Sequence, residues 1–193
     1  MEQNQFQEVV SMPRIGDAAP EFKAVTTQGD INFPSDYKGE WVILFSHRTI
    51  KEKIEYNGMK DVEVKFPLIE DIKMDIAKKY GMIQPNEDTT KAVRAVFFVD
   101  PKGIIRAMIY YPLSLGRNFD ELYRALIAMQ AADEFGVATP ADWEPGKDVI
   151  IGPAGSCGDA QGRMDDSDID CQDWFFCTKK LDKDTVLKKI LKK

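Results

Sequence analysis

Three short apolar runs constrain the fold of this chain more than any other feature. Two of them, Trp41–Ser46 and Arg94–Val99, are nearly continuous apolar sequences, a pattern typical of strands buried on both faces of a sheet. The third, Ile104–Tyr111, follows an Asp-Pro-Lys-Gly sequence. Proline in the second position and glycine in the fourth are typical of a β-turn. We therefore expect the second and third runs to form an antiparallel hairpin.

Helical patterns alternate with these runs. Asp71–Tyr80 has apolar residues at four-residue spacing and is closed by Gly81. Asn118–Phe135 has a longer apolar face, and Asn118 is a suitable N-cap with Glu121 three residues on. Buried strands that alternate with helices and end in strand–turn–strand–helix indicate an α/β chain with a thioredoxin-like fold, a central mixed sheet flanked by helices.

The chain is expected to divide into a core, residues 14–136, and an arm, residues 137–193. Within the arm, Thr139–Gly155 is rich in Pro and Gly and has no periodicity, whereas Asp182–Leu191 is expected to form a last helix. A short non-periodic tail does not leave much apolar surface exposed, so we expect this to be a dimerisation arm. The apolar side chains concerned are Trp143, Val149, Ile150, Ile151, Trp174, Phe175 and Phe176.

The composition excludes several classes of function. The 193 residues are 44% hydrophobic and 30% charged, which suits one soluble domain with a terminal extension. The net charge of -6 argues against nucleic acid as the main partner, because phosphate binding needs a positive surface. No run of 18 apolar residues is present, so no membrane span is expected. The N-terminus has no signal-peptide pattern, and we expect a cytoplasmic protein.

The cysteines are the residues most suited to chemistry. Cys157, Cys171 and Cys177 are too few for the disulfide scaffold of a secreted protein, so each is either inert or redox-active. Cys171 and Cys177 flank an aromatic segment and are read either as small buried apolar residues or as thiols with a function. A metal site is the weaker reading, since their spacing is not Cys-x-x-Cys and no histidine is near. No metal or organic cofactor is expected.

Six sequence blocks resemble the peroxiredoxin family in collinear order. They are WVILFSH, FPLIEDIKMDIAKKYGMI, VRAVFFVDPKGIIRAMIYYP, GRNFDELYRALIAMQ, VATPADWEPGKDVIIGP and CQDWFFCTKKL. The sequence FFVDPKGIIR occurs in many members. GRNFDE, ATPADW and the Cys-x-Asp-Trp-Phe-Phe-Cys stretch resemble the subgroup with a long C-terminal arm, which includes the one-cysteine enzymes and their archaeal and bacterial relatives.

This resemblance implies a thiol peroxidase and a set of partners. Such an enzyme reduces hydrogen peroxide or alkyl hydroperoxides, and its peroxidatic thiolate becomes a sulfenic acid. An intersubunit disulfide follows, which a thiol donor such as thioredoxin or glutaredoxin reduces. The resemblance also implies a homodimer, with a decamer as the larger alternative.

Four residues receive roles by the same resemblance. Arg117 matches the active-site arginine, whose guanidinium favours a thiolate and binds a peroxide oxygen; taken alone, it would be read as a surface arginine. His47 matches the position before the active-site loop, where it either supports the site or has no role. Cys177 matches the resolving thiol and Cys171 an auxiliary thiol, whereas Cys157 matches no family position.

The segment that should carry the peroxidatic cysteine is absent. In relatives, the FSH block leads into a loop with that cysteine, a long helix and a strand, but here His47 is followed at once by Arg48. About forty residues are missing, the size of one helix, one strand and their loops. Either the chain lacks this segment, or the printed sequence joins two stretches that the segment separates in the intact protein. We favour the second explanation, because a marginally stable core would not survive such a loss. The first would favour a non-catalytic scaffold.

Overall fold

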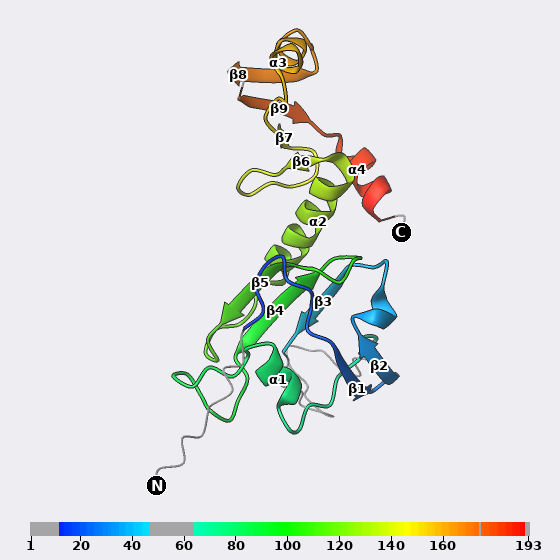
Figure 1. Ribbon diagram of the computed structural model, residues 1–193, viewed down its shortest axis with the longest axis vertical. Helices are drawn as coiled ribbons and strands as arrows, with labels where there is room; N and C mark the ends of the chain where they lie inside the picture. The colour runs from blue at the N-terminus through cyan, green and yellow to red at the C-terminus, as the bar shows by residue number, and fades with distance from the viewer. Residues whose placement is uncertain (1–11, 47–63, 174, 192–193) are drawn as a thin grey trace, which may run out of the picture. The chain divides into compact units, whose positions relative to one another are not determined.

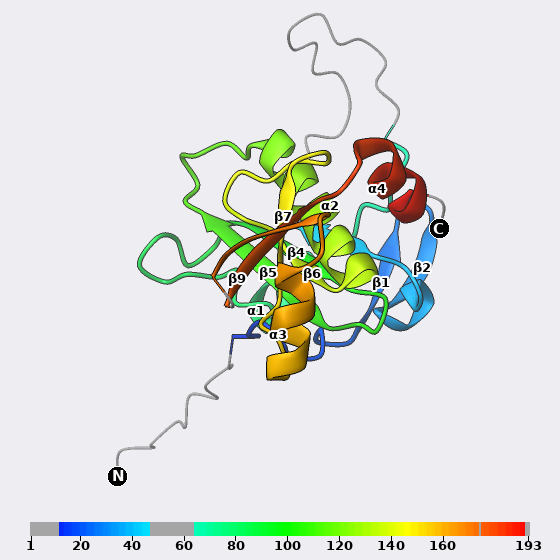
Figure 2. The same ribbon diagram turned by 90° about the horizontal axis from the view of Figure 1, so that it is seen from above.

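The computed structural model describes residues 12–46, 64–173 and 175–191. It falls into two units, Met1–Arg117 and Asn118–Lys193 (Figures 1 and 2). The expected break between His47 and Arg48 lies outside the described residues. Within the described ranges, no helix is both long enough and apolar enough to cross a membrane.

The first unit contains a three-stranded antiparallel sheet in the order β3-β4-β5 and a separate β1–β2 hairpin. A short 3-10 helix and a short α-helix complete it. The elements are β1 (Phe22–Thr26), β2 (Gly29–Phe33), η1 (Ser35–Tyr37), β3 (Val42–Phe45), α1 (Asp75–Lys79), β4 (Arg94–Val99) and β5 (Ile105–Tyr111).

The predicted hairpin is confirmed as β4 and β5. The Gly103 amide donates to the Asp100 carbonyl oxygen over 2.8 Å, and Oδ1 of Asp100 accepts hydrogen bonds from the amides of Lys102 and Ile104. Gly103 has a φ of 79°, a left-handed conformation that glycine adopts without steric cost. The turn residues therefore define the connection between the two strands.

Strand β3 departs from the predicted burial on both faces. All four of its residues, Val42–Phe45, are only half-buried, whereas Val96, Phe97 and Phe98 of β4 have no exposed surface. β3 stands at one end of the strand order and β4 in its middle. An apolar run indicates a strand that prefers burial, but it does not reveal which strand the rest of the chain covers.

A cluster of aromatic residues fills the core of the first unit. The fully buried Tyr80 ring packs edge-on against Phe97, with 4.9 Å between the ring centroids. The Tyr80 hydroxyl donates to the carbonyl oxygen of Pro20 over 2.8 Å, and the Tyr110 hydroxyl donates to that of Tyr80 over 2.9 Å. Both hydroxyls are therefore paired, as polar groups in a protein core generally are.

Helix α1 is shorter than the predicted Asp71–Tyr80. The Asp71 carboxylate accepts hydrogen bonds from the amides of Ile76 and Ala77 at 3.2 and 2.8 Å. It thus caps the helix from a turn outside it, and the helix begins at Asp75. The polypeptide leaves the helix through Gly81, whose φ is 62°.

The second unit combines two packed helices with a four-stranded antiparallel sheet in the order β6-β7-β9-β8. The elements are α2 (Phe119–Phe135), β6 (Val137–Ala138), β7 (Asp148–Ile151), α3 (Cys157–Met164), β8 (Ile169–Asp173), β9 (Phe176–Lys180) and α4 (Lys183–Ile190). The expected cap of α2 is present, because Oδ1 of Asn118 accepts hydrogen bonds from the amides of Asp120 and Glu121. The expected last helix is present as α4.

The arm is more regular than the sequence predicted. β7 lies inside the stretch expected to be irregular, and it pairs with β9. Trp143 and Val149 are fully buried in the core of this unit together with Ile127 and Val186. Trp143 and Val149 are therefore covered within the chain, whereas Phe175 of the same predicted set is 58% exposed, and the role of the arm in dimerisation stays a prediction. Because α2 shares this core, it groups with the arm, although the sequence placed it before the predicted boundary at residue 136.

The paired tyrosine hydroxyls give a testable pH dependence. Burial raises the pKa of Tyr110 to about 12, against an ordinary value near 10. The folded state therefore favours the neutral phenol of Tyr110. The stabilisation by this phenol is complete below pH 10, where the unfolded chain also keeps it neutral, and it is lost as the pH rises towards 12. Tyr110→Phe should lower the free energy of unfolding by about 1 kcal/mol at pH 7. Above pH 10, the free energy of unfolding of this variant should fall less steeply with pH than that of the parent protein.

Guanidinium unfolding curves between pH 7 and 12 measure both effects. Tyr123→Phe is the matched control, because Tyr123 is 57% exposed. Equal pH dependence in Tyr110→Phe and the parent protein would contradict the role given to the Tyr110 hydroxyl.

Candidate functional site

The Arg117 guanidinium lies at the end of β3. Its Nη2 donates to the carbonyl oxygen of Ser46, to Oγ of Ser46 over 3.0 Å and to the carbonyl oxygen of Ala95 over 3.1 Å. The antiparallel register of β3 and β4 brings these acceptors together, since the Ser46 amide also donates to the Ala95 carbonyl oxygen. The sequence assigned Arg117 to the active site by resemblance, and its chemical role stays a prediction.

At least one donor of the Arg117 guanidinium has no acceptor in the described part of the chain. Burial lowers the pKa of Arg117, and the positive charge of Arg94 lowers it further. The guanidinium carbon lies 5.6 Å from the centroid of the Phe45 ring. Nε of Arg117 is buried and has no hydrogen-bond acceptor among the described residues. A buried donor without an acceptor costs about 1–3 kcal/mol, so an anion or a peroxide oxygen bound here would be stabilised.

Ser46 and Arg94 belong to this site, although the sequence analysis did not identify them. Oγ of Ser46 donates to the Val93 carbonyl oxygen over 2.7 Å, and Nε of Arg94 donates to the Leu113 carbonyl oxygen over 3.1 Å. A signal was present: Ser46 ends one apolar run and Arg94 begins the next. Antiparallel pairing of those runs places the two ends together. His47, the remaining predicted site residue here, lies outside the described residues.

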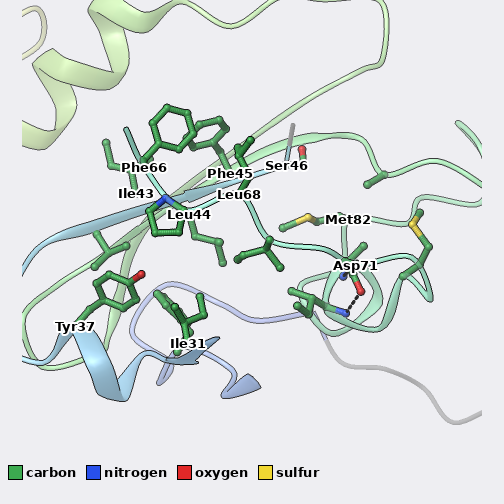
Figure 3. A pocket seen from close by; sticks show the side chains of 18 of the residues that line it. Ile31, Tyr37, Ile43, Leu44, Phe45, Ser46, Phe66, Leu68, Asp71 and Met82 are labelled. Carbon is green, nitrogen blue, oxygen red and sulfur yellow. Dashed lines mark hydrogen bonds between the residues drawn. The ribbon is translucent and has the colours of Figure 1, made fainter. Parts of the chain in front are cut away.

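An apolar cavity of about 490 Å³ lies beside β3 in the same unit (Figure 3). Apolar side chains form most of its wall, and Ser46 lies at its edge beside the Arg117 contacts. The wall includes Leu44, Phe66, Leu68, Met74 and Met82. The Asp71 carboxylate also reaches the cavity, but it is engaged by the amides at the start of α1.

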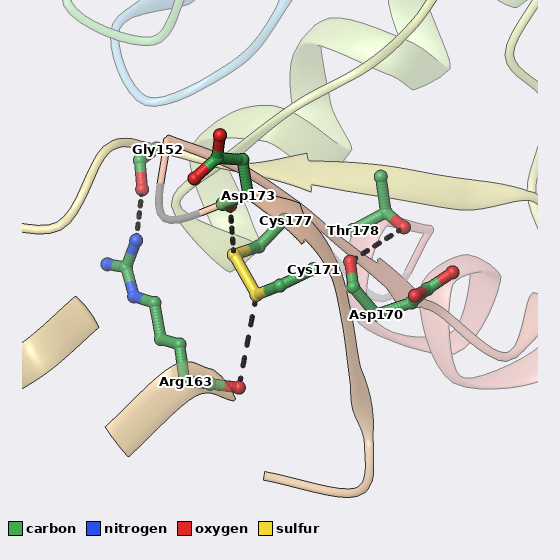
Figure 4. The surroundings of a disulfide bond; sticks show 7 residues. All are labelled: Gly152, Arg163, Asp170, Cys171, Asp173, Cys177 and Thr178. Carbon is green, nitrogen blue, oxygen red and sulfur yellow. Dashed lines mark hydrogen bonds between the residues drawn. A yellow bond between two sulfur atoms is a disulfide. The ribbon is translucent and has the colours of Figure 1, made fainter. Parts of the chain in front are cut away.

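Cys171 and Cys177 form a disulfide bond within one chain (Figure 4). They face each other across the β8–β9 hairpin, where their Cα atoms are 4.0 Å apart. The Cys177 side chain is buried, with 2% of the residue exposed, whereas Cys171 is half-buried. The register of the hairpin therefore brings the two sulfurs together. Their assigned roles as resolving and auxiliary thiols stay predictions.

The remaining cysteine is separate from this pair. Cys157 is an exposed free thiol at the first position of α3. Oγ of the preceding Ser156 caps the helix by accepting a hydrogen bond from the Asp159 amide over 3.1 Å. These contacts assign no role to Cys157.

Comparison with known proteins decides the family. The model of the AhpC/TSA family matches residues 46–108, and that of the C-terminal domain of 1-Cys peroxiredoxin matches residues 128–167. A peroxiredoxin of Methanosarcina mazei is 47% identical over 215 residues, which cover 88% of this chain and 98% of that protein. The chain belongs to the peroxiredoxin family. Peroxiredoxins are thiol-dependent peroxidases with a thioredoxin-like fold, which confirms the predicted fold class.

Further relatives support the assignment. A peroxiredoxin of Aquifex aeolicus is 40% identical over 222 residues, covering 90% of this chain and all of that protein. The structure of a yeast mitochondrial 1-Cys peroxiredoxin, solved to explain thiol resolution through glutathione and thioredoxin systems, has a TM-score of 0.71 and 28% identity. It covers 88% of this chain and 100% of that one.

This peroxiredoxin is shorter than its relatives inside the aligned region. In the Methanosarcina mazei comparison, 88% of 193 residues is about 170 residues, but the alignment runs over 215, so the relative has about 45 residues more. This difference agrees in size with the segment of about forty residues that the sequence analysis found absent after His47.

The contacts of Arg117 predict how its replacement affects stability. Arg117→Ala should lower the free energy of unfolding by about 1–2 kcal/mol, because the carbonyl oxygens of Ser46 and Ala95 lose a charged donor. Arg117→Lys should lie between this variant and the parent, since an ammonium group lacks the planar fork. Urea unfolding measures these values.

The matched control for these variants is Arg14→Ala. The Arg14 side chain is 81% exposed and pairs with Asp17 at the surface, where an ion pair contributes little. If Arg117→Ala is no less stable than Arg14→Ala, the described hydrogen bonds do not hold the end of β3.

Proposed function

We propose that this peroxiredoxin reduces hydrogen peroxide and alkyl hydroperoxides through a cysteine sulfenic acid and an intersubunit disulfide, and that Cys171 and Cys177 return the enzyme to its reduced state. The observation that carries the proposal is the Cys171–Cys177 bond, in which one sulfur is buried and the other is half-buried. The pair is a dithiol that can hold the two electrons of one turnover.

The proposed cycle begins at a thiolate. The thiolate attacks one peroxide oxygen, the O–O bond breaks, and an alcohol or water leaves while the sulfur becomes a sulfenic acid. In the reduced arm, Cys177 has to be exposed so that its thiolate can attack that sulfur on a neighbouring subunit. An intersubunit disulfide forms, and the hydroxide that leaves takes up a proton to become water. The Cys171 thiolate then attacks Cys177 Sγ, which releases the first cysteine as a thiolate and closes the Cys171–Cys177 bond.

The difference in burial selects the sulfur that an external donor attacks. Thiol–disulfide exchange requires a thiolate to reach one sulfur directly. Cys177 is 2% exposed, so attack falls on the half-buried Cys171, and Cys177 leaves as the thiolate. Thioredoxin or glutaredoxin is the proposed donor, and the structural relative from yeast mitochondria is linked to the glutathione and thioredoxin systems. These donors act in the reducing cytoplasm, where we place the protein.

Arg117 is proposed to act on the first step. Its buried Nε has no acceptor among the described residues, and its positive charge favours a thiolate over a thiol. The first cysteine itself would belong to the segment that relatives carry after this point, because no cysteine precedes Cys157 in the printed sequence.

A non-catalytic scaffold is the second candidate function. It is favoured by the position of all three cysteines after residue 156, and by the Arg117 Nη2 contacts with Ser46 and Ala95. Intact mass spectrometry separates the candidates. A mass near 21.9 kDa means that the chain itself lacks the segment and supports the scaffold, whereas a mass larger by several kDa supports the peroxidase.

The proposed cycle requires at least a homodimer, and a decamer is its larger form. Exposed aromatic side chains on the second unit offer contact surface, among them Phe119, Tyr123 and Phe175 at 67%, 57% and 58% exposure. Light scattering at micromolar concentration checks this assembly, and a monomer would contradict it.

Replacing the arm cysteines tests the cycle directly. After treatment with one equivalent of hydrogen peroxide, the parent protein should give a transient dimer band on non-reducing gels, and Cys177→Ser should remove that band and slow turnover with thioredoxin at least tenfold. Cys171→Ser should retain the band, because the intersubunit disulfide can then no longer pass to the Cys171–Cys177 pair.

Cys157→Ser is the matched control and should change neither the band nor turnover, because this thiol is exposed and outside the pair. A dimer band and full turnover in Cys177→Ser would assign resolution to an external thiol instead.

A further inference from the structure

Main-chain carbonyl oxygens lie at both ends of the arm disulfide. The Arg163 carbonyl oxygen is 3.9 Å from Cys171 Sγ. At the other end, the Asp173 carbonyl oxygen is 3.7 Å from Cys177 Sγ. Figure 4 shows each oxygen beyond its sulfur, on the side away from the other sulfur of the bond. Both ends of the S–S bond are therefore occupied by main chain.

The position of the Arg163 carbonyl oxygen affects thiol–disulfide exchange. An incoming thiolate bonds to one sulfur while the other sulfur leaves, so it approaches in line with the S–S bond, from the side opposite to the leaving sulfur. For attack on Cys171, the Arg163 carbonyl oxygen stands on that approach. Partial exposure of Cys171 is thus not sufficient for its reduction, and Arg163 has to move first.

Arg163 belongs to α3, which lies beside β8 (Figure 1). This helix of eight residues has no buried residue. It also contains Gly158 and Gly162, and glycine lowers the stability of a helix relative to alanine. Elements with few buried contacts open locally at a low cost in free energy. Helix α3 can therefore open while the strands of the sheet stay paired.

The Arg163 side chain holds the end of α3 in place. Its Nη1 donates to the carbonyl oxygen of Gly152, the residue that directly follows β7. Strand β7 pairs with β9, which carries Cys177. The side chain of Arg163 thus ties α3 to the sheet that holds the disulfide, while the main chain of the same residue covers Cys171.

We propose that α3 is a gate over the arm disulfide: a thiol donor reduces the Cys171–Cys177 bond only after α3 opens, and the Arg163–Gly152 hydrogen bond keeps the gate closed. This inference rests on the proposed function of the pair as the dithiol of the cycle, and it adds the control of its reduction. Arg163 is a positioning residue, because it acts through the place of its helix.

The rate at which dithiothreitol reduces the oxidised 193-residue chain tests the gate. One thiolate of the reagent attacks Cys171 Sγ, and Cys177 leaves as a thiolate. The second thiolate of the reagent then attacks the reagent's own sulfur in the mixed disulfide, which releases Cys171 as a thiolate and forms a cyclic disulfide. Two electrons thus pass to the protein. Alkylation with iodoacetamide followed by mass spectrometry counts the two thiols gained beside Cys157.

Variants of α3 should change this rate in opposite directions. Gly158→Ala/Gly162→Ala should slow reduction at least fivefold, because alanine stabilises the helix and an added methyl group has room at both positions. Arg163→Ala should speed reduction at least twofold, because the hydrogen bond to Gly152 is lost. Gly116→Ala is the matched control, since it also has room for a methyl group and lies in the other unit. It should react like the parent protein.

Urea distinguishes opening of α3 from unfolding of the whole arm. Opening of an exposed helix uncovers little surface, so the rate of reduction should change little up to about 1 M urea. A rate that rises with urea as steeply as the equilibrium constant of unfolding overturns the proposal. Equal rates in the parent protein and the α3 variants overturn it as well.

This test separates the gate from the proposed peroxidase cycle, because neither peroxide nor a peroxidatic cysteine takes part in it. If the α3 variants differ as expected but peroxide produces no dimer band, the gate stands and the cycle fails. If the dimer band appears but the variants are reduced at equal rates, the cycle stands and the gate is overturned.

Discussion

The pairing of β3 with β4 is the constraint on which the rest of the first unit depends. It brings the carbonyl oxygens of Ser46 and Ala95 close together. The guanidinium of Arg117, the last residue of the first unit, donates hydrogen bonds to both of them. Charged hydrogen bonds to main-chain oxygens are among the stronger polar contacts in proteins. The start of β4, the end of β3 and the chain before α2 are thereby tied together, and the cavity beside β3 has one fixed wall.

The parts of the fold that the sequence predicted are those set by local patterns. The Asp100–Gly103 turn and the Asn118 cap depend on residues within a few positions of each other, so their side chains alone indicate them. The β7–β9 pairing was not predicted, because the four residues Asp148–Ile151 acquire a partner about thirty positions later. The burial of Trp143 follows from the same non-local pairing.

The candidate site also has a part that local sequence motifs predicted and a part that depends on non-local strand pairing. Arg117 was identified from the motif that contains it, whereas Ser46 and Arg94 join it only through the register of two strands that are distant in sequence. For Cys171 and Cys177, the spacing allowed two separate thiols or a bridge, and only their position across a hairpin distinguishes these. Sequence motifs therefore identify the side chains that can carry chemistry, whereas the pairing of strands determines which of these side chains come into contact.

The short span of the arm disulfide has a thermodynamic consequence. A bridge between residues six positions apart restricts few conformations of the unfolded chain, and loop-entropy arithmetic gives it about 2 kcal/mol, less than a bridge across a longer loop. The flanking strand β9 is already held by β7 on its other side. We therefore expect β7 and β9 to stay paired when the bond opens. In the proposed cycle, such a pair of sulfurs would accept and release two electrons while the pairing of β7 with β9 persists.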